Sequence, residues 1–287
     1  MKAAFIGLGA MGTHMAANLA AKGLLSAVHD LDDAAARAAS DRLKVPAVAD
    51  PAALWRDSDA VVLCVSNDAA VREVVRALAV PAARGKCVID CSTVSPETAT
   101  EAAERLAAVG AQFIDAPING GTDGARTAKL IFILGGAPEA CEAMRPLFEA
   151  MGQRQIRIGD TGSGQATKAV NQALTAGIAQ AVTEGLAFAD ALGLPMPLVI
   201  ETLSTGAAGA WFAQNQTRRE IGREFPPGLK IDLHHKDLTI CQQLVAQIGG
   251  QLPTVDTTLA QYQTLMAQGY GEEDISALYR LNRKLFS

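Results

Sequence analysis

The chain has 287 residues, 49% of them hydrophobic and 19% charged, and carries a net charge of -5. This length and apolar content allow about two folded domains and exclude intrinsic disorder. With 25 basic against 30 acidic residues, the chain lacks the excess of cations that nucleic-acid binding requires, so no nucleic-acid partner is expected.

Short apolar runs alternate with helix-forming stretches over the first part of the chain. Strands are predicted at 2–6, 26–29, 60–65, 86–91, 112–115, 130–134 and 155–158. Helices are predicted at 10–21, 32–42, 69–78 and 96–108, the last with Pro96 at its start. Strands alternating with helices are typical of βαβ units, so we expect an α/β Rossmann domain with a mostly parallel sheet.

The pattern changes after Gly164. From 166 to 192 almost every residue favours a helix, and helical segments separated by Gly and Pro follow, with no convincing strand. We predict a Rossmann domain over 1–160 and an all-α C-terminal domain over 161–287, joined by a long interdomain helix at about 166–192. Because that helix is apolar on most faces, we expect it to be buried between packed partners.

The five cysteines match neither a disulfide framework nor a metal site. Cys64, Cys87 and Cys91 lie in apolar runs, where a free cysteine behaves as a small core residue. Three glycines interrupt the N-terminal apolar run before a signal-peptide core could form, and no stretch approaches the ~20 apolar residues of a membrane span. We therefore expect a cytoplasmic protein without a membrane partner or a bound metal.

The first motif is G-x-G-x-x-G, between the first strand and the first helix. It reads Gly7-Leu8-Gly9-Ala10-Met11-Gly12, and its glycines allow a tight turn, close approach of a pyrophosphate and close helix packing. Asp30 follows the second strand, where an acid accepts hydrogen bonds from the ribose and repels a 2′-phosphate. No arginine appears before Arg37, so NAD is predicted in preference to NADP.

Further polar residues follow the strands that end at 65 and 91. Val65-Ser66-Asn67 and Ser92-Thr93 are expected at the same crevice, because ligands of open α/β sheets bind outside the carboxyl ends of the strands. Asn119-Gly120-Gly121 comes after another strand, and its paired glycines suit a nest of N–H groups for a carboxylate.

Two polar side chains begin the long helix. Lys168 and Asn171 are three residues apart and share one helix face. A cation and an amide on an apolar helix are costly unless they meet a ligand or each other. The alternative is that Lys168 extends to solvent from the first turns.

With these motifs the sequence resembles the β-hydroxyacid dehydrogenase family, which includes 3-hydroxyisobutyrate dehydrogenase and tartronate semialdehyde reductase. The resemblance covers essentially the whole chain through four ordered blocks: GLGAMGTHMAANLAAKG, DAPINGGTDGA, GSGQATKAVNQ and Lys236-Asp237-Leu238. It implies that Lys168 is catalytic and that Asn171 orients the substrate. It also implies that Asn119, Gly120 and Gly121 bind the substrate carboxylate, that Thr93 and Lys236 approach the nicotinamide, and that the protein is a homodimer or homotetramer.

Three positions depart from the family pattern. Asn119 replaces the usual Ser, Ala128-Lys129-Leu130 replaces Gly-Thr-Leu, and Gln172 stands where many members have a second Asn. These changes leave the chemistry intact and leave the identity of the substrate open.

The predicted reaction is NAD-dependent oxidation of a 3-hydroxy acid of the 3-hydroxyisobutyrate type, or its reverse, with Lys168 as general acid/base. Near neutral pH this requires the lysine pKa to fall from ~10.4 toward ~7–8. Alternatives are a dehydrogenase of β-hydroxy amino acids or a tartronate semialdehyde reductase. Remoter alternatives are an imine reductase, which Lys168 disfavours, and a non-catalytic dinucleotide-binding module.

Four other side chains have weaker indications. His14 is interpreted as a surface or packing residue, and the adjacent His234 and His235 diverge too far on a helix to share a metal. One of these two histidines could border the site. Trp211 and Phe212 are interpreted as core residues, with closure of the substrate pocket as the alternative.

Overall fold

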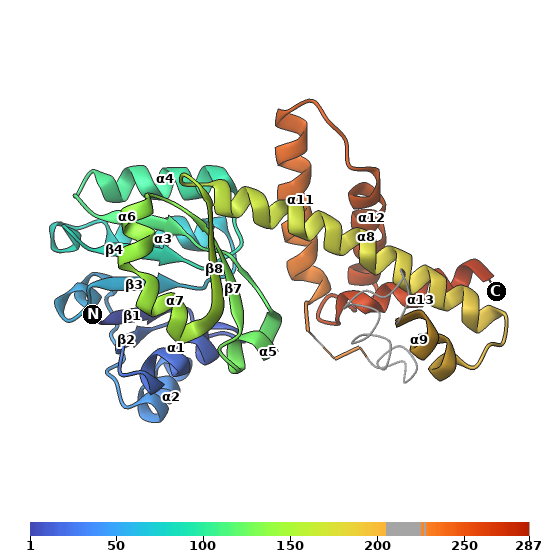
Figure 1. Cartoon of the computed structure of the whole chain (residues 1–287), viewed down its shortest axis with the longest axis horizontal. Helices are drawn as coiled ribbons and strands as arrows, with labels where there is room; N and C mark the ends of the chain where they lie inside the picture. Colours follow the sequence, from blue (N-terminus) through green and yellow to red (C-terminus); the bar gives the residue numbers. More distant parts are fainter. Residues whose placement is uncertain (205–224, 227, 287) are drawn as a thin grey trace. The chain divides into compact units, whose positions relative to one another are not determined.

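The computed structural model describes residues 1–204, 225–226 and 228–286. Trp211 and Phe212 therefore lie outside the described residues. The chain divides into two units, Met1–Lys168 and Ala169–Ser287. The predicted boundary at 160 falls between strand β8 (Gly152–Gly159) and helix α8 (Ser163–Ala191), a helix that carries residues of both units (Figure 1).

The first unit is built on one mostly parallel sheet, as predicted. Its strands run in the order β2-β1-β3-β4-β5-β7-β6, with β8 paired to β7. Five strands pair in parallel: β1 (Ala3–Ile6), β2 (Leu25–His29), β3 (Ala60–Leu63), β4 (Cys87–Asp90) and β5 (Gln112–Asp115). β8 pairs in parallel with β7. β7 (Leu130–Gly135) runs antiparallel to β5 and to β6 (Ile118–Asn119), a two-residue strand that the sequence did not indicate.

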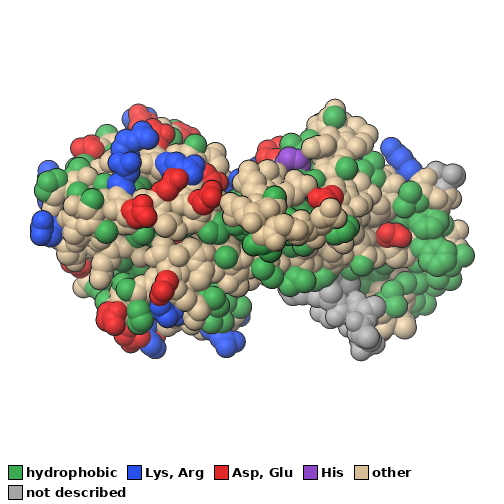
Figure 2. Space-filling model, turned by 90° about the horizontal axis from the view of Figure 1, so that it is seen from above, with side chains coloured by type: hydrophobic (Ala, Val, Ile, Leu, Met, Phe, Trp, Pro, Cys, Tyr) green, Lys and Arg blue, Asp and Glu red, His purple; other side chains and the backbone are tan. Residues whose placement is uncertain are grey.

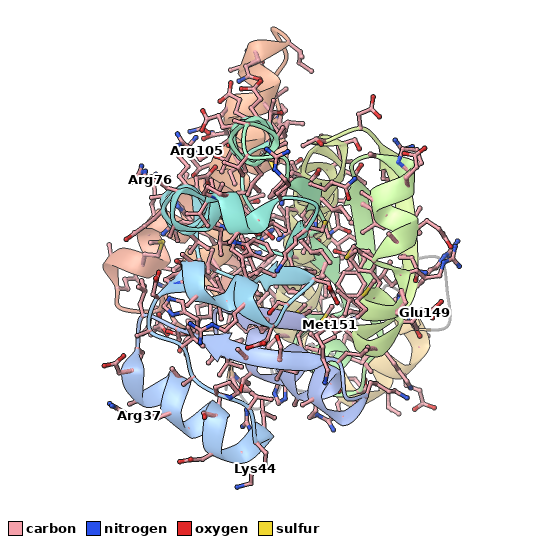
Figure 3. All side chains as sticks on the ribbon, turned by 90° about the vertical axis from the view of Figure 1, so that its left-hand side faces the viewer. Arg37, Lys44, Arg76, Arg105, Glu149 and Met151 are labelled. Atoms are coloured by element: carbon pink, nitrogen blue, oxygen red, sulfur yellow. The ribbon has the colours of Figure 1, made fainter. Side chains whose placement is uncertain are left out.

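Helices cover both faces of this sheet because successive strand residues point in opposite directions. Phe5 belongs to a core shared with α1 (Gly12–Ala21), α2 (Asp33–Leu43), α6 (Pro138–Ala143) and α7 (Arg145–Met151). Its neighbour Ile6 belongs to the opposite core, with Trp55 of the 3-10 helix η1 (Pro51–Arg56), α3 (Asp68–Leu78) and α4 (Pro96–Ala107). Arg76 and Arg105 project outward from α3 and α4, whereas Met151 of α7 is fully buried (Figure 3).

Ala128 is strained in the turn between α5 (Gly121–Arg126) and β7. Its φ of 53° lies in the left-handed region. This conformation raises the energy of a residue with a Cβ by about 1–2 kcal/mol, whereas glycine adopts it without strain. Ala128→Gly is therefore expected to raise the free energy of unfolding by about 0.5–1 kcal/mol, despite the greater entropy that glycine gives the unfolded chain. Urea titration in a Trp211→Phe background measures this, because Trp55 is then the only tryptophan and is buried in the first unit.

A matched control is Ala38→Gly, at an exposed position inside α2. The same chemical change in a helix should lower the free energy of unfolding by about 0.5–1 kcal/mol. If both variants lose stability, Ala128 is not strained.

The regular secondary structure of the second unit's described residues is helical, apart from an isolated bridge between Lys230 and Asp274. With the second part of α8 it comprises α9 (Met196–Ser204), α11 (Ile231–Gln247), α12 (Pro253–Ala267) and α13 (Tyr279–Asn282), with the short 3-10 helices η3 (Ile275–Leu278) and η4 (Arg283–Phe286). Its core joins Ala176 and Ala179 of α8 to Leu238 of α11 and Tyr262 of α12. Among the described residues no helix is long and apolar enough to cross a membrane.

One apolar face of α8 is exposed. Val170, Leu174 and Ile178, spaced four residues apart, are 62%, 64% and 40% exposed. We call these three residues the α8 stripe. Within one chain the stripe is uncovered, because α11 and α12 contribute to the core on the side of Ala176 and Ala179. Figure 2 shows further hydrophobic side chains gathered at one end of the same unit.

Candidate active site

The glycine-rich turn between β1 and α1 has the form that a dinucleotide requires. A Cβ on Gly7 would lie 2.2 Å from the Cys64 carbonyl oxygen, and one on Gly12 would lie 1.8 Å from the Gly7 oxygen. A Cβ on Gly9 would meet no atom within 4 Å. The fold itself therefore requires Gly7 and Gly12, whereas the space beside the exposed Gly9 suits a pyrophosphate at the start of α1.

Asp30 fastens this turn to the end of β2. Its Oδ2 accepts a hydrogen bond from the Leu8 N–H at 2.6 Å, and its Oδ1 accepts one from the Asp32 N–H at 2.9 Å. The carboxylate is half-buried and lies beside the turn. A carboxylate that accepts hydrogen bonds from the ribose hydroxyls of NAD is expected at this position. The fold therefore places Asp30 beside the glycine-rich turn.

Two arginines of α2 differ in their relation to the turn. Arg37 is exposed and projects outward from the helix (Figure 3). Arg42 donates a hydrogen bond to Thr13 Oγ1 on α1, a contact that the sequence did not indicate. It pairs the second helix of the unit with the helix that begins at the glycine-rich turn.

The ends of β3 and β4 are joined through Ser92. The Val65 N–H donates to Ser92 Oγ at 2.9 Å, so these two predicted strand ends are neighbours. Ser66 is exposed and Thr93 is half-buried. Asn67 is the N-cap of α3, and its side-chain oxygen accepts from the Ala70 N–H at 2.9 Å, so part of its hydrogen-bonding capacity serves the helix.

Gln165 fixes the segment after β4, although the sequence did not single it out. Its Nε2 donates to the Ser92 carbonyl oxygen at 2.8 Å, and its Oε1 accepts from the Val94 N–H at 3.2 Å. Thr93 lies between these two contacts. A buried amide of the first turn of α8 thus holds the segment whose threonine was predicted to lie near the nicotinamide.

Asp68 secures the start of α4 just beyond that segment. One carboxylate oxygen accepts from the Ser95 N–H, the Ser95 hydroxyl and the Thr98 hydroxyl at 2.7–2.9 Å. Partial burial acts to raise the pKa of Asp68, but these hydrogen bonds outweigh it, and the pKa is lowered from its usual value of 3.8.

Because the lowered pKa belongs to the folded state, this carboxylate stabilises the fold above its unfolded pKa, and that stability is lost as pH falls through the folded pKa. Asp68→Asn is expected to lower the free energy of unfolding by about 1 kcal/mol at pH 7, after allowance for solvent screening. The cost should shrink as urea titrations are moved below about pH 4. The control is Asp41→Asn, on the exposed side of α2. Its free energy of unfolding should stay within about 0.5 kcal/mol of the wild-type value. A pH-independent cost for Asp68→Asn would contradict the assignment.

Asp115 anchors the start of α8. The side chain is fully buried, its Oδ1 accepts from the Gly162 N–H at 2.8 Å and its Oδ2 accepts from the Gln165 N–H at 2.9 Å. A Cβ on Gly135 or Gly164 would lie 2.4 or 2.7 Å from the carboxylate oxygens, so both positions must be glycine to leave room. Burial raises the pKa of Asp115, against the lowering effect of the backbone N–H groups.

This anchor positions Lys168 on the second turn of α8. Lys168 is 8% exposed, and its Nζ donates to the Ile118 carbonyl oxygen at 2.8 Å and to Asn119 Oδ1 at 2.9 Å. The fold therefore brings together Lys168 and Asn119, which the sequence indicated separately. The alternative that Lys168 extends into solvent is wrong.

The two glycines after Asn119 both have left-handed backbone. Gly120 has a φ of 128° and Gly121 a φ of 60°, and Gly121 is the first residue of α5. The predicted glycine-bearing loop is therefore a short turn between β6 and a short helix. Consecutive N–H groups in such a turn can face an anion beside Asn119.

Asn171 and Lys236 belong to the second unit. Asn171 Nδ2 donates to Gln172 Oε1 at 3.0 Å, and Lys236 Nζ lies 3.1 Å from Asp237 Oδ1. His234 is fully buried, whereas His235 borders a cavity of about 450 Å³ lined by helical-unit residues alone. Within the described residues, no three His, Cys, Asp or Glu side chains are grouped to hold a metal ion.

A glycine-rich turn after β1 and a buried lysine near the start of α8 are the arrangement expected of a nicotinamide-dependent oxidoreductase. Residues 2–159 match the NAD-binding domain of 6-phosphogluconate dehydrogenase, and residues 162–282 match the NAD-binding domain of NADP-dependent 3-hydroxyisobutyrate dehydrogenase. The chain belongs to the β-hydroxyacid dehydrogenase family of 3-hydroxyisobutyrate dehydrogenase type, whose members are NAD(P)-dependent oxidoreductases acting on the CH–OH groups of hydroxy acids.

Relatives with different substrates match over nearly their full length. The chain is 34% identical to 2-hydroxy-3-oxopropionate reductase of Escherichia coli and 33% identical to NAD-dependent L-serine dehydrogenase of Pseudomonas aeruginosa, each over 97% of this chain and 96% of the relative. The structure of Mycobacterium tuberculosis 3-hydroxyisobutyrate dehydrogenase with L-serine superposes with a TM-score of 0.88 at 28% identity, covering 98% of this chain and 99% of that one.

An imine reductase from Pseudomonas sp. is more distant. It is 18% identical, with a TM-score of 0.64 over 97% of this chain and 98% of its own, so the likeness concerns the fold alone.

Proposed function

We propose that this protein oxidises a short 3-hydroxy acid of the 3-hydroxyisobutyrate type with NAD, or carries out the reverse reduction, and that Lys168 is the general acid/base. The observation that carries the proposal is the position of Lys168 Nζ, held at 2.8 and 2.9 Å by Ile118 O and Asn119 Oδ1. A proton-transferring lysine must be held in place beside the substrate, and the two acceptors that hold Lys168 near the Gly120-Gly121 turn support this role.

The substrate would be oriented through its carboxylate. The left-handed Gly120 and Gly121 can direct N–H groups toward it, and Asn119 and Asn171 add amide groups. In oxidation the neutral amine of Lys168 accepts the hydroxyl proton, and in reduction the ammonium returns it.

The cofactor would be held mainly by the glycine-rich turn and Asp30. The space beside Gly9 and the carboxylate at Leu8 fit a dinucleotide, and NAD when bound supplies the hydride acceptor. The other residues proposed to contact it are Ala10, Met11, Val65, Ser66, Asn67, Thr93 and Lys236. Asp30, Asp32 and the outward-projecting Arg37 support NAD over NADP.

A β-hydroxy amino acid is the second candidate substrate. It is favoured by the L-serine in the Mycobacterium tuberculosis structure and by the serine dehydrogenase of Pseudomonas aeruginosa. Tartronate semialdehyde, the substrate named for the Escherichia coli relative by its synonym 2-hydroxy-3-oxopropionate, is the third.

The test is a panel of 3-hydroxyisobutyrate, L-serine and glycerate, each with NAD and with NADP, followed by the absorbance of reduced nicotinamide. We expect the highest kcat/KM with NAD and 3-hydroxyisobutyrate. A higher value for L-serine or glycerate would transfer the assignment to that substrate, and no turnover with any 3-hydroxy acid would refute the function.

We further propose a homodimer or homotetramer in which the α8 stripe is covered by a second copy. Three aliphatic side chains in one exposed row support this, because their burial between copies is favourable. Sedimentation velocity should give a mass at least twice that of the chain, and Leu174→Glu should lower it. A monomeric wild type would refute the proposal.

We also propose a cytoplasmic location, which is supported by five cysteines without disulfide spacing.

A further inference from the structure

Gln172 connects α8 to α11 inside the second unit. The side chain is 3% exposed, its Nε2 donates to Asp237 Oδ2 at 2.6 Å, and its Oε1 accepts from Asn171 Nδ2 at 3.0 Å. Both ends of this amide are therefore used, one toward the neighbouring Asn171 and one toward the other helix.

Asp237 extends the connection to Lys236. The carboxylate is 5% exposed, and its second oxygen lies 3.1 Å from Lys236 Nζ in an ion pair without hydrogen-bond geometry. A buried carboxylate is costly unless it is paired, and here a buried amide and an ammonium both face it. Asn171, Gln172, Asp237 and Lys236 thus form one continuous polar network.

A second contact fixes the two helices at the same residue. His234 Nε2 lies 3.2 Å from the Gln172 carbonyl oxygen, and its Nδ1 lies 2.9 Å from Tyr262 Oη. The carbonyl can only accept, so Nε2 carries the hydrogen and Nδ1 can accept from the tyrosine. Burial raises the pKa of Tyr262 well above its usual value, which keeps its hydroxyl protonated. Gln172 is therefore held through both its backbone and its side chain.

We propose that Gln172 and Asp237 are positioning residues that hold Asn171 and Lys236 in one fixed arrangement. The inference rests on the proposed function, in which Asn171 orients the substrate and Lys236 serves the cofactor. The glutamine matters because an asparagine at this position would be shorter by roughly 1.5 Å, too short to keep a hydrogen bond that now spans 2.6 Å without movement of the helices.

The first test separates the charge of Asp237 from its hydrogen bond. Asp237→Asn keeps an oxygen that can accept from Gln172 but removes the charge beside Lys236. The dissociation constant of NADH, measured by its fluorescence, is compared in wild type, Asp237→Asn, Lys236→Met and the double variant. We expect Asp237→Asn to weaken binding about fivefold in wild type and to have no effect when Lys236 is methionine. Equal weakening in both backgrounds would mean that Asp237 has only a structural role and would overturn the inference.

The second test concerns Gln172 and uses two substitutions that differ in shape. Gln172→Met keeps the length of the side chain without its amide, and Gln172→Asn keeps the amide without the length. Both should raise KM for the hydroxy acid about tenfold with kcat within about twofold, and neither should raise it further in an Asn171→Ala background. A wild-type KM for both variants, or the same rise in the Asn171→Ala background, would overturn the inference.

These outcomes are distinguishable from failure of the proposed function. If no hydroxy acid is oxidised by the wild-type protein, the function is refuted, but the NADH measurements still decide whether Asp237 acts through Lys236. If Asp237→Asn does not fold, the Gln172 variants still decide whether Gln172 holds Asn171, because their substitutions leave the Asp237–Lys236 pair in place.

Discussion

Lys168→Met is expected to lower kcat by about 10²–10⁴-fold, whichever 3-hydroxy acid is the substrate. The methionine fills a similar volume but cannot exchange a proton, and it leaves Ile118 O and Asn119 Oδ1 without their shared donor. The dissociation constant of NADH should stay within about twofold, because the glycine-rich turn and Asp30 do not depend on the lysine side chain. Steady-state kinetics and NADH fluorescence together measure both quantities.

The matched control is Lys22→Met, at an exposed lysine at the C-terminus of α1. It loses the same charge in the same unit and should retain wild-type kcat. Near-normal turnover by Lys168→Met would remove Lys168 from the mechanism, and loss of NADH binding would assign it to the cofactor instead.

The parts of the fold that follow from local sequence were predictable. The four-residue strands β1, β3 and β4 are buried along their whole length, so β1 and β3 appear in the sequence as uninterrupted apolar runs, and β4 as an apolar run that ends in Asp90. Gly7, Gly9 and Gly12 were predictable because the glycines of a dinucleotide-binding turn lie at fixed spacings within six residues. Asp30 was predictable because it comes directly after a strand.

Residues that act across long separations were not predictable in the same way. Asp115 bonds Gln165 across 50 positions, and Gln172 bonds Asp237 across 65. Each is a polar residue within a recognisable motif, but nothing local shows which backbone or side chain it will face. The strand β6 was also missed, because two residues are too few for a periodic pattern and its pairing with β7 exists only in the folded sheet.

The α8 stripe illustrates a different limit. Apolar residues on every face of a helix indicate burial, but the pattern is the same whether the cover comes from the same chain or from a second copy. The structure assigns Ala176 and Ala179 to the core of the unit and leaves Val170, Leu174 and Ile178 outside it. Only the fold could make this division.

Asp115→Asn is expected to lower the free energy of unfolding of the first unit by about 2–3 kcal/mol. One amide oxygen can still accept from Gly162 or Gln165, but the NH₂ group must then face the other N–H in a site closed by Gly135 and Gly164. A buried donor left without an acceptor carries most of the cost. Urea titration in the Trp211→Phe background measures it, with Asp160→Asn as control, because Asp160 is 99% exposed and should cost less than about 0.5 kcal/mol.

The pH dependence of this cost should be opposite to that of Asp68→Asn. Burial raises the pKa of Asp115 in the folded state, so its contribution to stability is complete below the unfolded pKa and declines as pH rises through the folded pKa. The difference between wild type and Asp115→Asn should therefore be larger at acid pH than at pH 7, whereas the difference for Asp68→Asn should be smaller. Two carboxylates of one unit would then report opposite balances between desolvation and hydrogen bonding. If both differences shrink on acidification, the hydrogen bonds from Gly162 and Gln165 outweigh the burial of Asp115, and its pKa is lowered rather than raised.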